Sequence, residues 1–244
     1  MAVNKPYYRI YRPGLRRDML NNPTEGYERD ALFLPEAERK SMLMAARLII
    51  DDFERLFEYV EPHTNNENAF SHRIYELLLR ACTEVESCCK RILIANGYAA
   101  NNMNDYKKIE QATHLSGYTV LYSNWLPSQY TVHPFANWAT GGSLPWYQAY
   151  NDVKHNRSQQ FHLASLKNLL DSICGLLCII HSQIGDSVQR VFQSNVYFSA
   201  LNDDKVTVRS FTITPYQFSD SEKYDFDWDN IKTDPNRFQR FLFA

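Results

Sequence analysis

The stretch NAFSHRIYELLLRACTEVESCCKRILIANG, residues 68–97, determines the fold class of this chain. Its apolar residues recur at steps of three and four, the spacing of one face of an α-helix. They are Ile74, Leu77, Leu78, Ala81, Val85, Cys88, Cys89 and Ile92. The pattern predicts a long helix from about Asn68 to Asn96, and Gly97 is a plausible C-terminal stop.

The same spacing extends to both sides of this stretch. Residues 36–60 carry one apolar stripe after Pro35, a residue that often opens a helix. Because only the breaker-rich turn 61–66 separates the two segments, we expect an antiparallel helix hairpin. A further long helix is predicted over about 163–185.

The remaining segments favour smaller elements. We expect a short helix over 105–114 and another that begins near Pro145. The aromatic segment 115–145 is predicted to be a β-hairpin or an ordered loop inserted into the bundle. Within the last fifty residues, 196–198 and 206–213 are typical of strands, with a hairpin turn expected at 202–204.

These elements predict a mostly α protein, a four- to five-helix antiparallel bundle with short β elements near the C-terminus. We divide the chain into an extended N-terminal arm (1–34) packed on the bundle, the bundle itself (35–194), and a C-terminal β-hairpin with an aromatic tail (195–244). All three are expected to form one globular unit.

Composition limits the classes of function. Of the 244 residues, 44% are hydrophobic, enough for a sizeable core, and the net charge of −2 argues against a protein built mainly to coat nucleic acid or an anionic membrane. No apolar run reaches the ~18 residues of a membrane span, and the N-terminus lacks the apolar stretch of a signal peptide. We therefore expect a cytoplasmic protein that does not enter a membrane.

Cofactor and metal motifs are missing from the sequence. There is no GxxxxGK[ST], GxGxxG or GxSxG, which disfavours P-loop, Rossmann and α/β-hydrolase functions. The five cysteines lie in helix-forming stretches without a CxxC pair, so we interpret them as buried free thiols. We expect no metal and no cofactor.

The segment WYQAYNDVKHNR, residues 146–157, carries the candidate chemistry. On a helix, Asn151 and His155 share a face, and Tyr150 and Lys154 pair on the next. An imidazole beside cations suits phosphodiester chemistry, with His155 as general acid or base and with Lys154 and Arg157 stabilising phosphoryl charge. The alternative is a solvated basic corner between helices.

Two neighbouring features could complete a site. Glu84 lies at the edge of the apolar stripe, where it could orient His155 or neutralise Lys154, although an intrahelical pair with Arg80 explains it equally simply. The aromatic residues between Tyr118 and Trp146 could stack on bases or form an interface with a protein. Because that run carries no nearby Lys or Arg, packing in a core or interface is favoured.

The helix pair, the Tyr150–Arg157 segment and the final long helix together resemble the HEPN superfamily over about residues 36–185. The resemblance implies an all-α homodimer that acts on RNA without metal or cofactor, in phage-defence or toxin–antitoxin systems. Asn151 and His155 match the polar residue and the histidine of the family motif, and Tyr150 stands where the family has Arg.

Two functions follow from this resemblance. The first is a catalytically silent binding or regulatory module that contacts RNA, or a protein partner through its aromatic loop. The alternative is a metal-independent endoribonuclease with a composite dimeric site. In that case His155 is the acid/base, Asn151, Lys154 and Arg157 hold the phosphate, and Tyr150, Trp146 and Glu84 line the substrate site.

Overall fold

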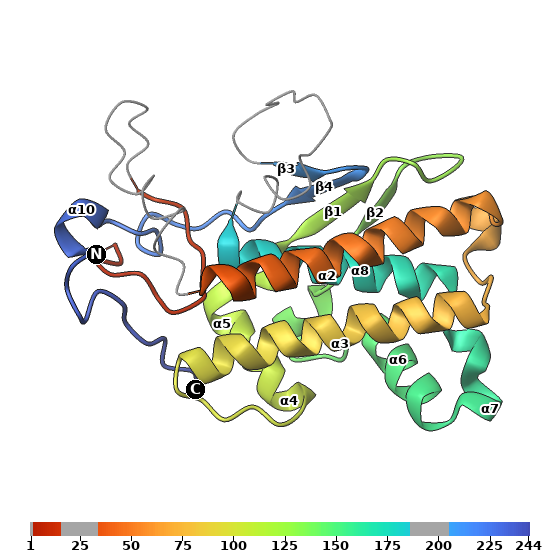
Figure 1. Ribbon diagram of the computed structural model, residues 1–244, viewed down its shortest axis with the longest axis horizontal. Helices are drawn as coiled ribbons and strands as arrows, with labels where there is room; N and C mark the ends of the chain where they lie inside the picture. Colours follow the sequence, from red (N-terminus) through yellow and green to blue (C-terminus); the bar gives the residue numbers. More distant parts are fainter. Residues whose placement is uncertain (1, 16–33, 186–204) are drawn as a thin grey trace.

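The computed structural model describes residues 2–15, 34–185 and 205–244 (Figure 1). Four longer helices dominate this part of the chain: α2 (Glu36–Arg55), α3 (His72–Ala95), α6 (Pro145–His155) and α8 (Leu166–Ile184). Short α-helical turns accompany them: α4 (Met103–Tyr106), α5 (Glu110–Thr113), α7 (Arg157–Gln160) and α10 (Trp228–Ile231). The expected mostly helical class with a small amount of strand is confirmed.

The helices α2 and α3 run antiparallel beside each other, as the short connection between them requires (Figure 1). The start of α3 is fixed by Ser71, whose hydroxyl accepts a hydrogen bond from the Ile74 amide. Its end is followed by Gly97, whose φ of 83° lies in the left-handed region that glycine adopts without strain. The predicted helix stop at Gly97 is confirmed.

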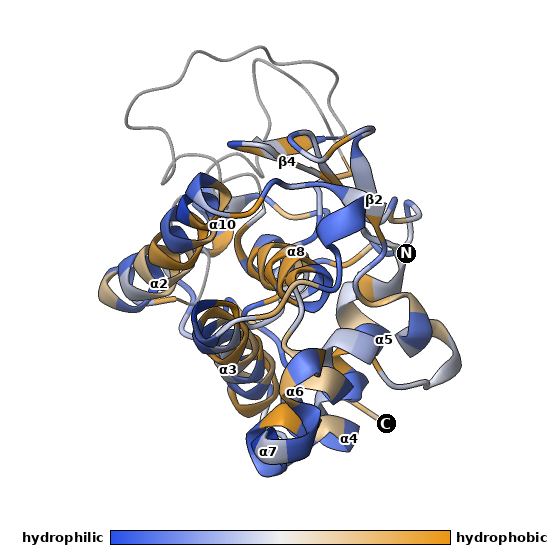
Figure 2. Ribbon diagram, turned by 90° about the vertical axis from the view of Figure 1, so that its right-hand side faces the viewer, coloured by the Kyte–Doolittle hydropathy of each residue, from blue (hydrophilic) through white to orange (hydrophobic). Residues whose placement is uncertain are grey.

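The helix α8 forms the centre of the molecule. All of its residues except Lys167 and Asn168 are buried, and it packs against α2, α3, α6 and the sheet (Figure 2). A helix buried on nearly every side belongs to the interior of a domain, where other elements surround it. The run of Leu and Ile in this segment therefore places it in the core.

A four-stranded antiparallel sheet covers one side of the helices. Its strands are β1 (Thr119–Tyr122), β2 (Tyr130–Val132), β3 (Val206–Val208) and β4 (Phe211–Thr214), in the order β2-β1-β4-β3. The β1–β4 pairing sets Tyr122 opposite Phe211. The insertion and the C-terminal segment, far apart in the sequence, thus form one sheet.

One strand prediction needs correction. The run 206–213 is not one strand, because the backbone turns at Arg209, which has a φ of 52°. Arg209 bonds the carboxylates of Asp51 and Glu54 on α2, and these contacts fix the turn against that helix. Residues 196–198 and the turn expected at 202–204 lie outside the described residues.

The aromatic insertion is part of the core. Five of its six large rings are at most 4% exposed: Tyr118, Tyr122, Trp125, Phe135 and Trp138. The sixth, Tyr130, is partly buried. The structure confirms core packing for these five rings, and a protein partner at the aromatic loop stays a prediction. Burial of such rings stabilises the fold by removing their large apolar area from water.

The two terminal segments pair with each other. Val3 forms a β-bridge with Tyr224, and Tyr7 forms one with Gln239. The N-terminal arm also reaches α8, where the Tyr11 amide donates to the Ser182 carbonyl at 2.8 Å. The described part of the arm, residues 2–15, therefore packs on the helical core and on the tail.

Within the described residues, no helix is both long and apolar enough to cross a membrane. The same part of the chain holds no group of three or more His, Cys, Asp or Glu side chains suited to a metal ion. The five cysteines are free and buried, as the sequence predicts.

Candidate functional site

The segment 146–157 divides into two parts. The helix α6 ends at His155, and Asn156 leaves the helical region with φ −138° and ψ 57°. Arg157 then begins α7. A continuous helix through Lys154 and Arg157 is therefore wrong, because the chain turns between them and the two cations face different surroundings.

The first part contains two buried aromatic residues. Trp146 and Tyr150 are 2% and 1% exposed, and the Trp146 indole donates to the Pro134 carbonyl at 2.8 Å. Lys154 Nζ donates to Tyr150 Oη at 2.9 Å, and this bond raises the pKa of Lys154. The predicted Tyr150–Lys154 pair is confirmed, but both rings belong to the core and offer no face to a substrate.

Beside α6 lies an open pocket of about 460 Å³, which we call the α6 pocket. Asn151 and Lys154 line it from α6, so the structure brings these two predicted residues together. Across from them lie the carboxylate of Glu86 on α3 and three asparagines around the start of α4: Asn101, Asn102 and Asn104. The lining atoms are predominantly polar.

Glu86 is held in place by Tyr147, whose hydroxyl donates to Glu86 Oε1 at 2.5 Å. Burial, together with this bond and the nearby carboxylate, raises the pKa of Tyr147, so the phenol keeps its proton. Glu86 also contributes to the raised pKa of Lys154 through the attraction of opposite charges. The two charged groups therefore act on each other across the pocket.

The sequence analysis named Glu84 as the carboxylate of the candidate site, whereas the carboxylate that lines the pocket is Glu86. Glu84 does not line the pocket, and Arg80 bonds Asp52 of α2 in place of the expected intrahelical partner. The sequence feature that indicates Glu86 is Cys82, which was left out of the apolar stripe and is fully buried. Including Cys82 widens the apolar stripe toward the side of the helix on which Glu86 lies.

The second part of the segment joins an aromatic group at the start of α3. The Arg157 guanidinium lies 5.5 Å from the Tyr75 ring centroid and 5.8 Å from that of Phe161. Phe161 in turn contacts Phe70 at 5.7 Å and His72 at 4.8 Å between centroids. We call these five residues the Phe161 cluster.

Much of the Phe161 cluster is accessible. Phe70 is 50% exposed, and His72 and Arg157 are also exposed. An exposed aromatic ring beside a guanidinium offers both a stacking face and a cation to a ligand. The predicted cation Arg157 thus belongs to an aromatic surface and not to the α6 pocket.

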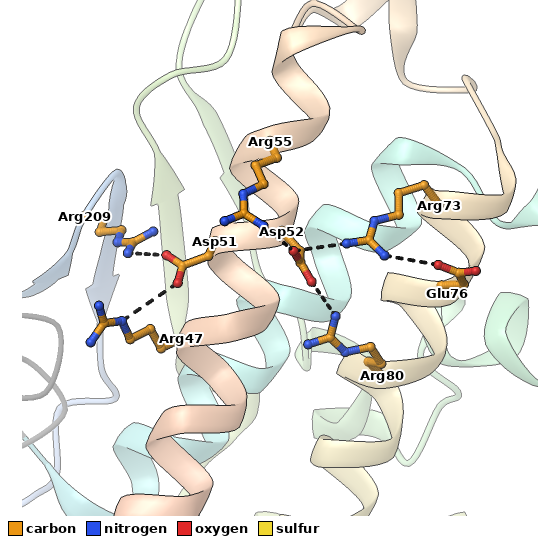
Figure 3. Close-up of polar contacts among 8 residues, drawn as sticks. All are labelled: Arg47, Asp51, Asp52, Arg55, Arg73, Glu76, Arg80 and Arg209. Atoms are coloured by element: carbon orange, nitrogen blue, oxygen red, sulfur yellow. Dashed lines mark hydrogen bonds and ion pairs between the residues drawn. The ribbon is translucent and has the colours of Figure 1, made fainter.

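Three arginines gather around Asp52 (Figure 3), and one of them, Arg73, directly follows His72 of the Phe161 cluster. Asp52 accepts contacts from Arg80 at 2.6 Å, Arg73 at 3.0 Å and Arg55 at 3.3 Å. The bond from Arg80 is the main cause of the lowered pKa of Asp52. Arg73 also pairs with Glu76, so three cations share two carboxylates and leave one net positive charge.

His155 is exposed at the end of α6. In the part of the chain that the structure describes, it makes no ion pair with Glu84, and Glu84 does not contact Lys154. The role expected for Glu84 as their partner therefore has no geometric support. One turn before His155, Asn151 reaches the α6 pocket.

No family model, curated protein or solved structure matches this chain. The site geometry is therefore the basis of the functional proposal.

Proposed function

We propose that this chain is a HEPN-like helical binding module that engages single-stranded RNA through the Phe161 cluster. The observation that carries the proposal is the exposed Arg157–Phe161–Phe70 arrangement beside the arginines of α3. Aromatic side chains stack on unpaired bases at about 1–3 kcal/mol per base, and Arg adds a cation–π contribution.

The charge distribution supports a modest affinity. Arg73 directly follows His72 of the cluster, so a strand whose base stacks on Phe70 or Phe161 passes a guanidinium that can contact its phosphate. Since the whole chain carries a net charge of −2, little non-specific attraction assists binding. Stacking then contributes most of the affinity, and we expect a weak dependence on salt.

The test is fluorescence anisotropy with a labelled oligouridine. Phe70→Ala and Arg157→Ala should each weaken binding about tenfold, the lower range of one lost stacking contact. Tyr59→Ala is the matched control, because this side chain is 85% exposed outside the cluster, and it should bind like the parent. Equal affinity of the parent and both cluster variants would reject the proposal.

The endoribonuclease is the second candidate, favoured by the exposure of His155 one turn from the pocket residue Asn151. In this mechanism His155 takes the proton of the RNA 2′-hydroxyl, whose oxygen attacks the adjacent phosphorus while the P–O5′ bond breaks. The products are a 2′,3′-cyclic phosphate and a 5′-hydroxyl, whose oxygen is protonated by an imidazolium at His155. Lys154 neutralises the developing charge and Asn151 positions the phosphate, whereas Arg157, beside Tyr75 and Phe161, contacts the strand outside the pocket. Cleavage of labelled RNA in the presence of EDTA, abolished by His155→Ala, would support it; cleavage unchanged in His155→Ala would reject it.

The homodimer and a role in phage defence or a toxin–antitoxin system are proposals supported by the HEPN resemblance alone. Sedimentation velocity of the purified chain tests the first. A dimer that brings two copies of His155 within reach of one RNA strand would strengthen the ribonuclease candidate over the silent module.

A further inference from the structure

The α6 pocket contains an ammonium and a carboxylate that face the same space without bonding each other. Lys154 is bonded to Tyr150, and Glu86 is bonded to Tyr147. Among the described residues the two charges form no ion pair, although both line the pocket. Each tyrosine holds its charged partner in place.

We propose that the α6 pocket binds a free α-amino acid as its zwitterion, with the ligand ammonium on Glu86 and the ligand carboxylate on Lys154. A ligand that carries both charges can form an ion pair with the Glu86 carboxylate and with the Lys154 ammonium at the same time. A ligand with only one charge leaves either the carboxylate or the ammonium without an oppositely charged partner. This site is distinct from the Phe161 cluster and does not depend on RNA binding.

The lining of the pocket favours this class of ligand. A volume of about 460 Å³ lies in the range of about 300–1,000 Å³ typical of small-molecule sites. Such sites are usually apolar, but here Asn101, Asn104 and Asn151 provide amides that both donate and accept hydrogen bonds. These amides suit the polar ends of a small zwitterion.

The same lining disfavours a nucleobase. A base would need an open aromatic face for stacking, but the rings that reach the pocket are buried, with Tyr106 at 7% and Tyr147 at 6% exposure. A guanine nucleotide, whose base could also bridge a carboxylate and an ammonium, is therefore the competing outcome of the test.

The experiment measures the unfolding temperature of the full chain with each of the twenty common L-amino acids, followed by calorimetry of those that raise it. We expect at least one amino acid to bind saturably. Its N-acetyl form, which lacks the ammonium, and its amide, which lacks the carboxylate, should each bind at least tenfold more weakly. Equal binding of either derivative would overturn the proposal.

Substitutions then locate the site. Glu86→Gln and Lys154→Met should each weaken binding at least tenfold. Glu84→Gln, on the same helix but outside the pocket, and the exposed Lys90→Met are matched controls and should leave binding unchanged. Circular dichroism confirms that each variant is folded, and Asn104→Ala, an exposed residue of the lining, provides a milder change that should also weaken binding.

Three results would overturn the proposal: no response to any amino acid, binding that survives both Glu86→Gln and Lys154→Met, or binding of guanosine monophosphate in place of amino acids. Phe70→Ala separates this site from the proposed function, because it should reduce RNA binding and leave amino-acid binding intact.

Discussion

Arg80 Nη1 lies 2.6 Å from Asp52 Oδ2, and this ion pair joins the middle of α3 to the end of α2 (Figure 3). The Asp52 side chain is 16% exposed, whereas that of Arg80 is 40% exposed. The Asp52 carboxylate is therefore the less exposed partner of this ion pair, and Arg80 is the more exposed one. Arg73 and Arg55 complete the shell around Asp52.

The first prediction concerns this ion pair. Asp52→Asn should lower the free energy of unfolding by about 1 kcal/mol, the scale of a largely exposed ion pair. The bond from Arg80 lowers the pKa of Asp52 below its ordinary 3.8, so the stabilisation is present above that pH and is lost as the pH falls through the folded-state pKa.

Urea unfolding at neutral pH and below pH 3.8 tests this pH dependence. The difference in the free energy of unfolding between the parent and Asp52→Asn should shrink in acid. Glu58→Gln is the control, because this exposed carboxylate lies just beyond α2 and should change stability little. A difference that grows in acid would contradict the prediction.

The second prediction compares two isoleucines on α3. Ile92 is fully buried and Ile94 is 55% exposed. Ile92→Ala should lower the free energy of unfolding by about 3 kcal/mol, because it removes buried methylene groups and leaves a cavity. Ile94→Ala should cost less than about 1 kcal/mol. Urea midpoints measure both, and similar losses would show that α3 is not packed as described.

The third prediction concerns the contact between β2 and α8. Lys167 Nζ donates to Tyr130 Oη at 2.6 Å and to Asp171 Oδ2 at 2.8 Å. Lys167→Met leaves the buried Asp171 carboxylate without its cation and should cost about 2 kcal/mol at neutral pH. Exposed Lys40, paired with Glu36, provides the control. Lys40→Met should lower the free energy of unfolding by only a few tenths of the loss expected for Lys167→Met.

The stability lost in Lys167→Met depends on pH through a raised carboxylate pKa, that of Asp171, whereas the effect at Asp52 depends on a lowered one. Burial raises the pKa of Asp171 above its ordinary value, and loss of Lys167 should raise it further. Folded protein then takes up a proton more readily than unfolded protein, so the destabilisation in Lys167→Met should diminish as the pH falls through the raised pKa. A loss independent of pH would mean that Lys167 contributes by packing alone.

The fourth prediction concerns thiol reactivity. All five cysteines are buried, and burial raises the pKa of Cys88 to about 11. Because the thiolate is the reactive form, the native protein should react very slowly with a thiol reagent such as DTNB at neutral pH. All five should react after unfolding in guanidinium. Rapid reaction of one thiol in the native protein would place that cysteine at the surface.

Local sequence patterns predicted the helices well. The apolar stripe at steps of three and four, Ser71 before α3 and Gly97 after it were enough to locate that helix. The Tyr150–Lys154 pair was predictable for the same reason, since both residues lie one turn apart on one helix. Such features depend only on neighbours within a turn of the chain.

The candidate site was only half predictable. Asn151 and Lys154, both named from the sequence, line one pocket, and Glu86 reaches that pocket from a different helix. Arg157 was expected beside Lys154, whereas the break at Asn156 turns it toward Tyr75 and Phe161. The break in the helix at Asn156 could not be predicted from the spacing of side chains, because several backbone conformations are compatible with the same residues.

The sequence by itself determined the mostly helical class, the long helices and the burial of the cysteines, because each follows from residue spacing and local propensity. Only the tertiary structure decided that β1 of the insertion pairs with β4 near the C-terminus, that Arg80 binds Asp52, and that Glu86 and Lys154 share a pocket. These relationships join residues far apart in the chain, and their partners are selected by how the helices and the sheet pack around α8.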